Sequence, residues 1–317
     1  MTGLSCSDGS LAVAEPMHGT APYALAWVAL EQNGPWGAKA LTDSHLDPEV
    51  GRALEAAAGA HDVRPSLIRR PGRHADEPHA HGTPRRVLVA HTRPGVAWLL
   101  EGTVTDPAAL LDTDWAALRD GDLEAVRRSL ATLTPSERPH LLVCTNAKRD
   151  VCCAVKGRPV ALGAAAVNPE QVWEVTHTSG HRFAPTAVLL PAGTLHGRLD
   201  VGTAGELLRA AERGATVIQG SRGRSTWHPP AQAAELAVRR EHHVLGLDAL
   251  RVTAHEQTAD RSWTTTLHHD DGRSWTVRVE ARENPEVLRA ESCGKALKPM
   301  TWYTLVEEGE GSLTFGS

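Results

Sequence analysis

The sequence has no long hydrophobic run and no basic start. The longest apolar stretch near the N-terminus, YALAWVAL at 23–30, is far shorter than the roughly 20 residues that a membrane helix needs. The first lysine or arginine is Lys39, so the charged beginning of a secretory signal peptide is missing. These two absences predict a cytoplasmic protein with no membrane partner.

The chain also lacks an excess of positive charge. It has 33 Lys and Arg against 38 Asp and Glu, a net charge of -5 with His neutral. No basic block interleaved with aromatic residues is present, so we expect no nucleic-acid partner. The length of 317 residues, with 41% hydrophobic and 22% charged residues, is typical of a globular protein of two or three domains.

Several catalytic signatures are missing. A C-x-x-C pair is absent, so dithiol exchange lacks its usual motif. Neither G-x-G-x-x-G nor a Walker sequence occurs, which argues against a built-in nicotinamide or ATP site. No pair of carboxylates stands out for glycoside hydrolysis. Enzymatic activity is therefore uncertain, and an electron carrier or a binding protein is as compatible with the sequence.

What the chain does contain is a recurring order of predicted elements: strand, helix, strand, hairpin and closing helix. The first series consists of a strand at 23–32, a helix at 47–61, a strand at 64–70, two strands within 85–104 and a helix at 115–133 that breaks near Gly121. The second consists of a strand at 140–146, a helix at 157–167, a strand at 171–177, a hairpin at 185–200 and a helix at 203–214. This is the element order of a thioredoxin-like fold, and it predicts an α/β protein with two tandem thioredoxin-like units.

The ends of the chain differ from these two series. Residues 1–20 lack periodicity and are expected to be a coil lead-in. After about 221 the sequence predicts a small α+β region, with a helix at 229–246, a hairpin at 261–282 and a last strand at 300–308. The predicted domains are therefore 21–135, without a site, 136–220, with a site, and 221–317.

Cysteine and histidine gather in the second unit. Cys144 and Cys153, with eight residues between them, follow one predicted strand, and His177 and His181, with three between them, follow the next. Loops at the carboxyl ends of neighbouring parallel strands lie side by side, so the four side chains are expected in one neighbourhood. Thiolates and imidazoles are ligands of zinc and of iron–sulfur clusters.

The spacing of the thiols distinguishes between these metals. Structural zinc sites usually place their cysteines two to four residues apart, whereas the gap here makes a wide loop. A cluster of two irons is larger than a single ion, and two Cys on one iron with two His on the other is the ligation of Rieske centres.

The residues also resemble a known family. CTNAKRDVCCAVKGRP, together with VWEVTHTSGHRFAPTAVLLPAG, is similar to the sucrase/ferredoxin-like family of thioredoxin-fold ferredoxins, as is EQNGPWGAKAL at 31–41. The resemblance covers roughly 20–225 and, more faintly, the tail. The family motif is C-x8-C followed by H-x-G-G-H, and here Ser179 stands at its first glycine. The resemblance implies a [2Fe-2S] cluster held by Cys144, Cys153, His177 and His181.

These observations lead to the hypothesis of a one-electron carrier with an unidentified redox protein partner. Two imidazoles in place of two thiolates raise the potential above that of all-Cys ferredoxins by several hundred mV. The second ring N–H of each ligand can titrate, so we expect the potential to fall with rising pH under alkaline conditions. The alternatives are a zinc-stabilised, non-redox binding module with the same four ligands, and a thiol-dependent enzyme acting on peroxide or a disulfide through Cys152 or Cys153.

Other residues near the motif have less certain roles. Cys152 competes with Cys153, but the family pattern favours Cys153, and a core position is expected for Cys152. Lys148 and Arg149 either offset cluster charge and steer an acidic partner or form a solvated loop face, and Asp150 is available to pair with either. Pro185 lies where thioredoxin-like folds have a cis-proline. Cys6 and Cys293 are isolated in sequence and would form a redox pair only if the fold brings them together.

Overall fold

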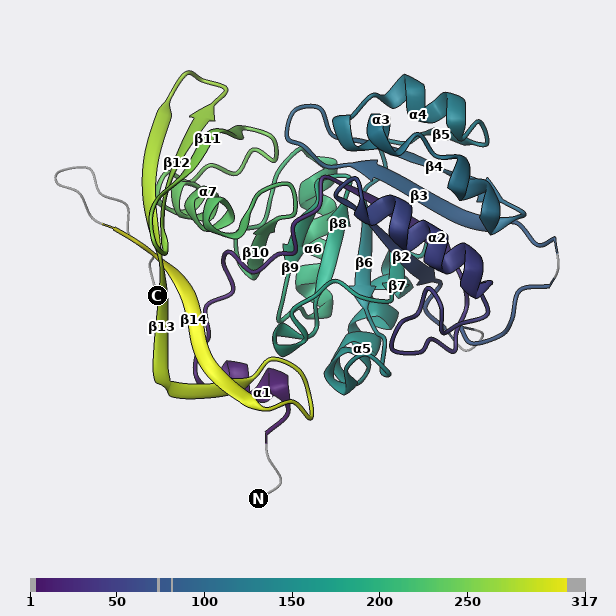
Figure 1. The fold of residues 1–317 in the computed structure, drawn as a ribbon, viewed down its shortest axis with the longest axis horizontal. Helices are drawn as coiled ribbons and strands as arrows, with labels where there is room; N and C mark the ends of the chain where they lie inside the picture. Colours follow the sequence, from purple (N-terminus) through teal and green to yellow (C-terminus); the bar gives the residue numbers. More distant parts are fainter. Residues whose placement is uncertain (1–3, 73–74, 81, 307–317) are drawn as a thin grey trace.

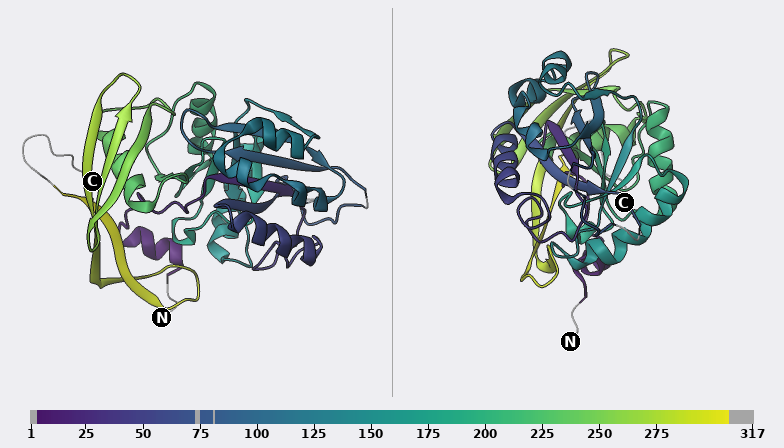
Figure 2. Two further views of the ribbon diagram at one scale, coloured as in Figure 1. Left: turned by 45° about the horizontal axis from the view of Figure 1, so that its top comes forward. Right: turned by 90° about the vertical axis from the view of Figure 1, so that its right-hand side faces the viewer.

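The computed structural model describes residues 4–72, 75–80 and 82–306. One large mixed sheet lies beside a smaller antiparallel sheet, and helices cover the large sheet on its outer sides (Figures 1 and 2). The predicted α/β class is confirmed. Within the described ranges, no helix combines the length and apolar character needed to cross a membrane.

The large sheet has ten strands in the order β10-β9-β8-β6-β7-β2-β1-β3-β4-β5. In chain order its strands are β1 (Ala26–Glu31), β2 (Val63–Arg69), β3 (Arg85–His91), β4 (Trp98–Val104), β5 (Leu133–Pro135), β6 (His140–Cys144), β7 (Val172–Val175), β8 (Ala187–Leu190), β9 (Thr194–His196) and β10 (Ser221–Arg224). The short strands β5 and β10 at its two edges had no counterpart among the predicted elements.

The two halves of this sheet have the same topology. In the first half the order is β2-β1-β3-β4, with β1 and β2 parallel and the other pairs antiparallel. In the second half it is β7-β6-β8-β9, with β6 and β7 parallel and the other pairs antiparallel. The halves join where β2 pairs antiparallel with β7, at Ile68 opposite Val175. The second strands of the two series therefore meet at the centre of the sheet.

The helices follow the order expected from the sequence. They are α2 (Pro48–Gly59), η1 (Pro107–Asp112), α3 (Trp115–Asp120) and α4 (Leu123–Ser129) in the first half, and α5 (Val151–Val167), η2 (His181–Phe183) and α6 (Val201–Glu212) in the second. Because side chains alternate along a strand, Val143 packs with α5 and α6 on one face of β6, while Leu142 and Cys144 lie in the core on the other face.

Two predictions about helices were wrong. The expected coil at 1–20 contains α1 (Cys6–Ala12), which Ser5 caps by accepting a hydrogen bond from Asp8 N and which buries Cys6. Helix α5 begins at Val151, not near Gly157, because Asp150 caps it. Pro159 lies inside the helix and removes one backbone donor there.

The C-terminal region forms the second sheet. Its elements are α7 (Pro229–Glu241), β11 (Leu250–Ala259), β12 (Ser262–His269), β13 (Ser274–Ala290) and β14 (Leu297–Leu305), with strand order β11-β12-β13-β14. Strand β11 was not predicted, and residues 307–308 of the predicted last strand lie outside the described ranges. The long β13–β14 ribbon extends past its own sheet to α1, so the segment that follows β13 lies beside the N-terminal helix (Figure 1).

Candidate metal centre

Cys144 is the last residue of β6 and is buried in the core. Its backbone N–H donates to Thr186 O at 2.8 Å, and its side chain is 1% exposed. Gly157 of α5 lies so close that an added Cβ would be 2.2 Å from Cys144 O. The glycine therefore allows α5 to pack directly against the strand end that carries the thiol.

Cys153 lies in the first turn of α5, not in the wide loop that the spacing predicted. Asp150 accepts a hydrogen bond from Cys152 N at 2.9 Å and so fixes this turn. The Cys153 side chain is fully buried and shares a core cluster with Cys144. The helix start thus aims Cys153 at the end of β6.

The two histidines lie on the turn after β7 and at the start of η2. Ser179 and Gly180 both have positive φ, 66° and 68°. An added Cβ at Gly180 would be 2.4 Å from Arg222 Nη2, while Arg222 Nη1 donates to Ser179 O at 3.0 Å. Buried Arg222 therefore holds the turn that places His177 and His181.

The structure brings all four predicted ligands together. Cys153 Sγ lies 3.2 Å from Nδ1 of His181, and the rings of His177 and His181 stack with centroids 4.7 Å apart. The Cys153 thiol and, secondarily, the His177 ring hold the pKa of Cys144 well below its ordinary value. Each of the four side chains therefore lies next to at least one other predicted ligand.

The pKa values of His181 and Cys153 are also shifted. Burial lowers the pKa of His181 to about 4, and the nearby His177 acts in the same direction, so this imidazole is neutral at pH 7. The Cys144 thiol and burial raise the pKa of Cys153. A neutral imidazole and one thiolate-prone sulfur are the states that metal coordination requires.

Two arginines, Arg64 and Arg222, place positive charge beside the four side chains. Arg64 donates to His177 O at 3.4 Å, and buried Arg222 donates to Thr178 O and Ser179 O. Neither arginine forms an ion pair with a carboxylate in the described part of the chain, and burial lowers the pKa of Arg64 to about 10 and of Arg222 to about 9. Each pKa is partly raised again by Cys144, so negative charge at the sulfurs stabilises both arginines. The site therefore fits a group that accumulates negative charge.

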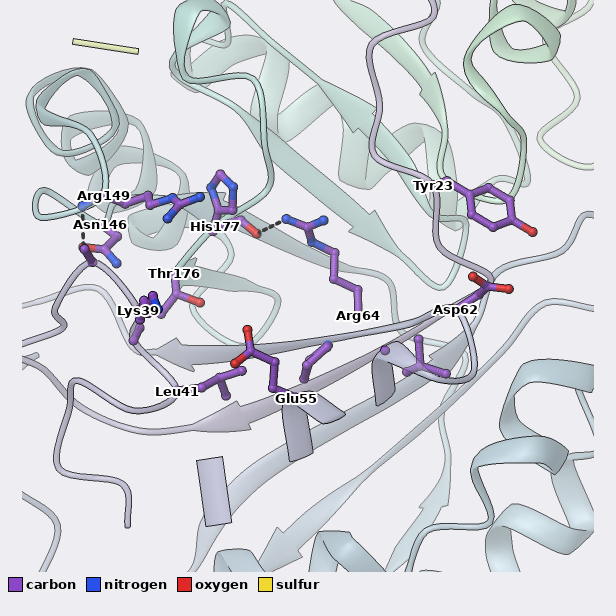
Figure 3. A pocket seen from close by; sticks show the side chains of 15 residues that line it. Tyr23, Lys39, Leu41, Glu55, Asp62, Arg64, Asn146, Arg149, Thr176 and His177 are labelled. Atoms are coloured by element: carbon purple, nitrogen blue, oxygen red, sulfur yellow. Dashed lines mark hydrogen bonds between the residues drawn. The ribbon is translucent and has the colours of Figure 1, made fainter. Parts of the chain in front are cut away.

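A cavity of about 510 Å³ opens on this site between the two halves of the sheet (Figure 3). His177 and Thr176 line it from the second half, and Lys39, Arg64 and Arg149 add basic groups. His177 is half-buried, whereas His181 is only 8% exposed. His177 is therefore the ligand nearest to solvent.

A second sulfur group includes Cys152, the residue before Cys153, and was not predicted as a group. Cys6, Cys152 and Cys293 meet with Asp150, whereas the sequence predicted only a core position for Cys152 and left open whether Cys6 and Cys293 meet. Asp150 pairs with neither Lys148 nor Arg149, because it is buried and accepts hydrogen bonds from Ser292 and Cys293. The one indication in the sequence was the number of cysteines. Two of the five are predicted cluster ligands, which leaves three thiols for another group.

The left-handed turn leads to a prediction about Ser179. Replacement by glycine relieves a positive φ worth about 1–2 kcal/mol and costs about 0.5–1 kcal/mol of backbone entropy. Ser179→Gly is therefore expected to stabilise the protein by about 0.5–1 kcal/mol, measured as a higher denaturation midpoint. Exposed Ser274 in β13 is the control. Ser274→Gly is expected to destabilise, and a loss of stability in both variants would contradict the account of the turn.

Comparison with protein families decides the classification. The sucrase/ferredoxin-like family profile matches residues 17–223, which include all four predicted ligands. The chain belongs to the sucrase/ferredoxin-like family. The predicted membership is thus confirmed, and the family match ends at β10, before the C-terminal sheet. No curated protein and no solved structure gives a significant match.

Proposed function

We propose that this member of the family is a one-electron carrier with a Rieske-type [2Fe-2S] cluster. Cys144 and Cys153 would hold one iron, and His177 and His181 would hold the other. The observation that carries the proposal is the meeting of two like pairs, with Cys144 and Cys153 in one buried core cluster and the rings of His177 and His181 stacked at a centroid distance of 4.7 Å. Such a cluster supplies one-electron redox chemistry when it is bound.

The shape of the ligand set supports two irons over one zinc ion. A single tetrahedral ion gathers its ligand atoms around one point, within about 4 Å of one another. Among the described residues, the one group of three or more such atoms that all lie within 4.8 Å of one another is Cys6, Asp150, Cys152 and Cys293. In the part of the chain that the structure describes, no three of Cys144, Cys153, His177 and His181 form such a group, which supports two joined metal ions over one.

Two arginines favour the reduced state in this proposal. Reduction adds one negative charge at the site, and Arg64 and Arg222 lie beside the ligand loop without a carboxylate to neutralise them. In a partly desolvated site a nearby positive charge is worth about 1–2 kcal/mol at an effective dielectric of 20. The two guanidinium groups therefore add to the effect of imidazole ligation in raising the potential.

The cavity beside His177 is the proposed exit for electrons. His177 lies at its wall, and exposed Arg149 reaches into it (Figure 3). Basic groups at this opening would steer an acidic redox protein toward the half-buried ligand. The partner in this proposal is an unidentified redox protein, with no role for nucleic acid or a membrane.

The architecture and location belong to the same proposal. Each half of the large sheet has the strand order 2-1-3-4 with the first two strands parallel, which supports two tandem thioredoxin-like units at 21–135 and 136–220, with 221–317 as a separate region. The peptide bond before Pro185 is cis, as expected. All five cysteines carry free thiols, which persist in a reducing compartment such as the cytoplasm.

Changing one histidine ligand tests the proposal. His181→Cys is expected to retain the cluster with a potential lower by roughly 100 mV or more, because a thiolate replaces a neutral ring. His181→Ala is expected to lose the cluster. The measurements are the visible spectrum and a redox titration, and exposed His268 provides a control whose alanine variant keeps both unchanged. An unchanged spectrum in His181→Ala would show that the assignment is wrong.

A further inference from the structure

Three thiols from distant parts of the chain meet at one point. Cys6 lies on α1, Cys152 on the first turn of α5, and Cys293 follows β13. Their sulfur atoms form a triangle, with Cys152 3.6 Å from Cys6 and 3.3 Å from Cys293, and Cys293 3.5 Å from Cys6. Cys6 and Cys152 are 1% and 2% exposed.

The triangle has the size of one face of a tetrahedral zinc site. Zinc–sulfur bonds of about 2.3 Å at tetrahedral angles place the sulfur atoms about 3.8 Å apart. An oxygen ligand at about 2.1 Å would lie about 3.6 Å from each sulfur. Both carboxylate oxygens of Asp150 lie 3.6 Å from Cys6 Sγ, and the four ligand atoms of Cys6, Asp150, Cys152 and Cys293 all lie within 4.8 Å of one another, so Asp150 is close enough to serve as the fourth ligand.

The carboxylate of Asp150 is already oriented. Its Oδ2 accepts from Ser292 Oγ and Cys293 N, both at 2.7 Å, while Oδ1 accepts from Cys152 N at 2.9 Å. The second acceptor position of Oδ1 faces the Cys6 thiol at 3.6 Å and becomes available to a metal when that thiol loses its proton. Hydrogen bonds of this kind orient the ligands of metal sites.

We propose that Cys6, Cys152, Cys293 and Asp150 form a structural site for one zinc ion. Four protein ligands complete the coordination, which is the mark of a structural site with no open position for a substrate. Binding would release the thiol protons to solvent and leave three thiolates on the metal. The ion would connect α1 and the segment after β13 to the first turn of α5. Its ligand there, Cys152, immediately precedes Cys153.

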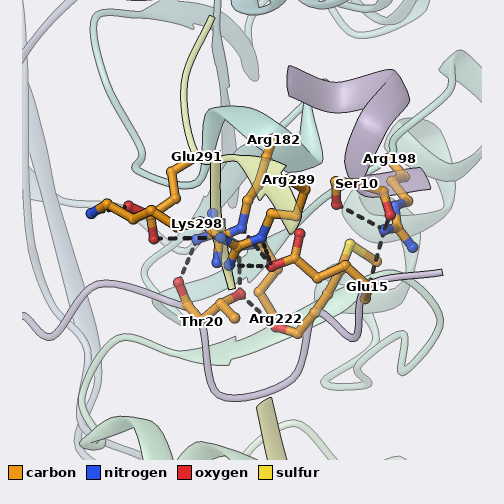
Figure 4. A network of polar contacts seen from close by, with 10 residues as sticks. Ser10, Glu15, Thr20, Arg182, Arg198, Arg222, Arg289, Glu291 and Lys298 are labelled. Carbon is orange, nitrogen blue, oxygen red and sulfur yellow. Dashed lines mark hydrogen bonds and ion pairs between the residues drawn. The ribbon is translucent and has the colours of Figure 1, made fainter. Parts of the chain in front are cut away.

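Independent contacts hold the same segments in place. Buried Glu15, after α1, pairs with Arg182 at 2.8 Å and with Arg289 of β13 at 2.8 Å, and Arg198 donates to its backbone oxygen (Figure 4). Glu15 is fully buried and Arg289 is 2% exposed. These buried ion pairs therefore join the segments that carry Cys6 and Cys293 independently of the sulfur triangle.

Other occupants fit the triangle less well. A disulfide joins two sulfur atoms at about 2.05 Å, so it would use only two of the three thiols and would leave Asp150 without a role as ligand. A four-iron cluster binds each thiolate to its own iron, which separates the sulfurs more widely than one shared ion does. Thiolates with one carboxylate match zinc, which accepts sulfur, nitrogen and oxygen ligands.

Metal analysis of the full-length protein tests this site separately from the cluster. We expect about one zinc per chain, independent of iron content, in protein purified without added metal. After removal of zinc with a chelator under reducing conditions, added Co²⁺ is expected to give the visible bands of tetrahedral thiolate coordination. Absence of zinc together with no Co²⁺ bands, or a disulfide among these cysteines in protein alkylated without reductant, would overturn the proposal.

Two variants give opposite results if both sites exist. Cys293→Ser, at the half-buried ligand least tied to the core, is expected to lower zinc at least tenfold and to leave iron unchanged. Cys144→Ser is expected to lose iron and retain zinc. Zinc that stays in Cys293→Ser but leaves in Cys144→Ser would place zinc in the other four ligands and contradict both proposals. Iron absent from the wild type with zinc still lost in Cys293→Ser would overturn only the proposed function.

Discussion

Cys144→Ser and Cys153→Ser are each expected to abolish iron binding, whereas Cys152→Ser is expected to retain the iron of the wild type. Cys144 and Cys153 share a buried core cluster and face the histidines, through the 3.2 Å contact to His181. Cys152 is the next residue on the same helix turn, but its sulfur points to Cys6 and Cys293. The measurement is iron and acid-labile sulfide per chain after anaerobic purification.

Because Cys152 and Cys153 are adjacent, the comparison separates a specific loss of iron from a general loss of stability. Each variant replaces one buried sulfur by oxygen on the same helix turn, so a general loss of stability would affect Cys152→Ser and Cys153→Ser alike. Equal loss of iron in both, with both proteins folded by circular dichroism, would contradict the assignment of Cys153. Retention of iron in Cys153→Ser and its loss in Cys152→Ser would mean that the seven-residue spacing is the ligand spacing.

Glu15→Gln is expected to destabilise the protein by about 3–5 kcal/mol, because it removes the fully buried carboxylate that pairs with half-buried Arg182 and buried Arg289. Glu15 Oε1 pairs with both Arg182 and Arg289. Arg182 follows directly on His181, so the same change should also weaken retention of the cluster. The measurement is the shift of the urea midpoint, followed both by circular dichroism and by the visible spectrum.

An exposed carboxylate outside this region provides the control. Glu124 of α4 pairs with Arg127 at 3.0 Å, and both side chains are exposed. Such a pair contributes about 0–1 kcal/mol, so Glu124→Gln is expected to shift the midpoint little. Similar shifts of the urea midpoint in the two variants would show that the ion pairs of Glu15 with Arg182 and Arg289 stabilise the protein no more than an exposed ion pair does.

The sequence predicted best those features that depend on local patterns. The strands predicted at 140–146 and 171–177 correspond to β6 and β7, and the rule for parallel strands placed Cys144 and His177 at the same sheet edge. The helix predicted at 157–167 begins six residues earlier in the structure, because the Asp150 cap decides its start. An Ala-rich segment shows that a helix is present but does not locate its first residue.

The second sulfur group was beyond the reach of sequence reasoning for a different reason. Its cysteines lie at positions 6, 152 and 293, and their meeting depends on the length and bend of β13, where the register shifts between Asn284 and Leu288. Short edge strands such as β5 and β10 also depend on neighbours far along the chain. Tertiary pairing, not local propensity, determines both features.

The most direct test of the central claim is the paramagnetic spectrum of the anaerobically purified wild type, read together with its iron and sulfide content. The account predicts a coloured protein with about two irons and two sulfides per chain and, on reduction by one electron, a Rieske-type signal. A colourless, diamagnetic protein whose Cys144, Cys153, His177 and His181 hold a single zinc ion would contradict it.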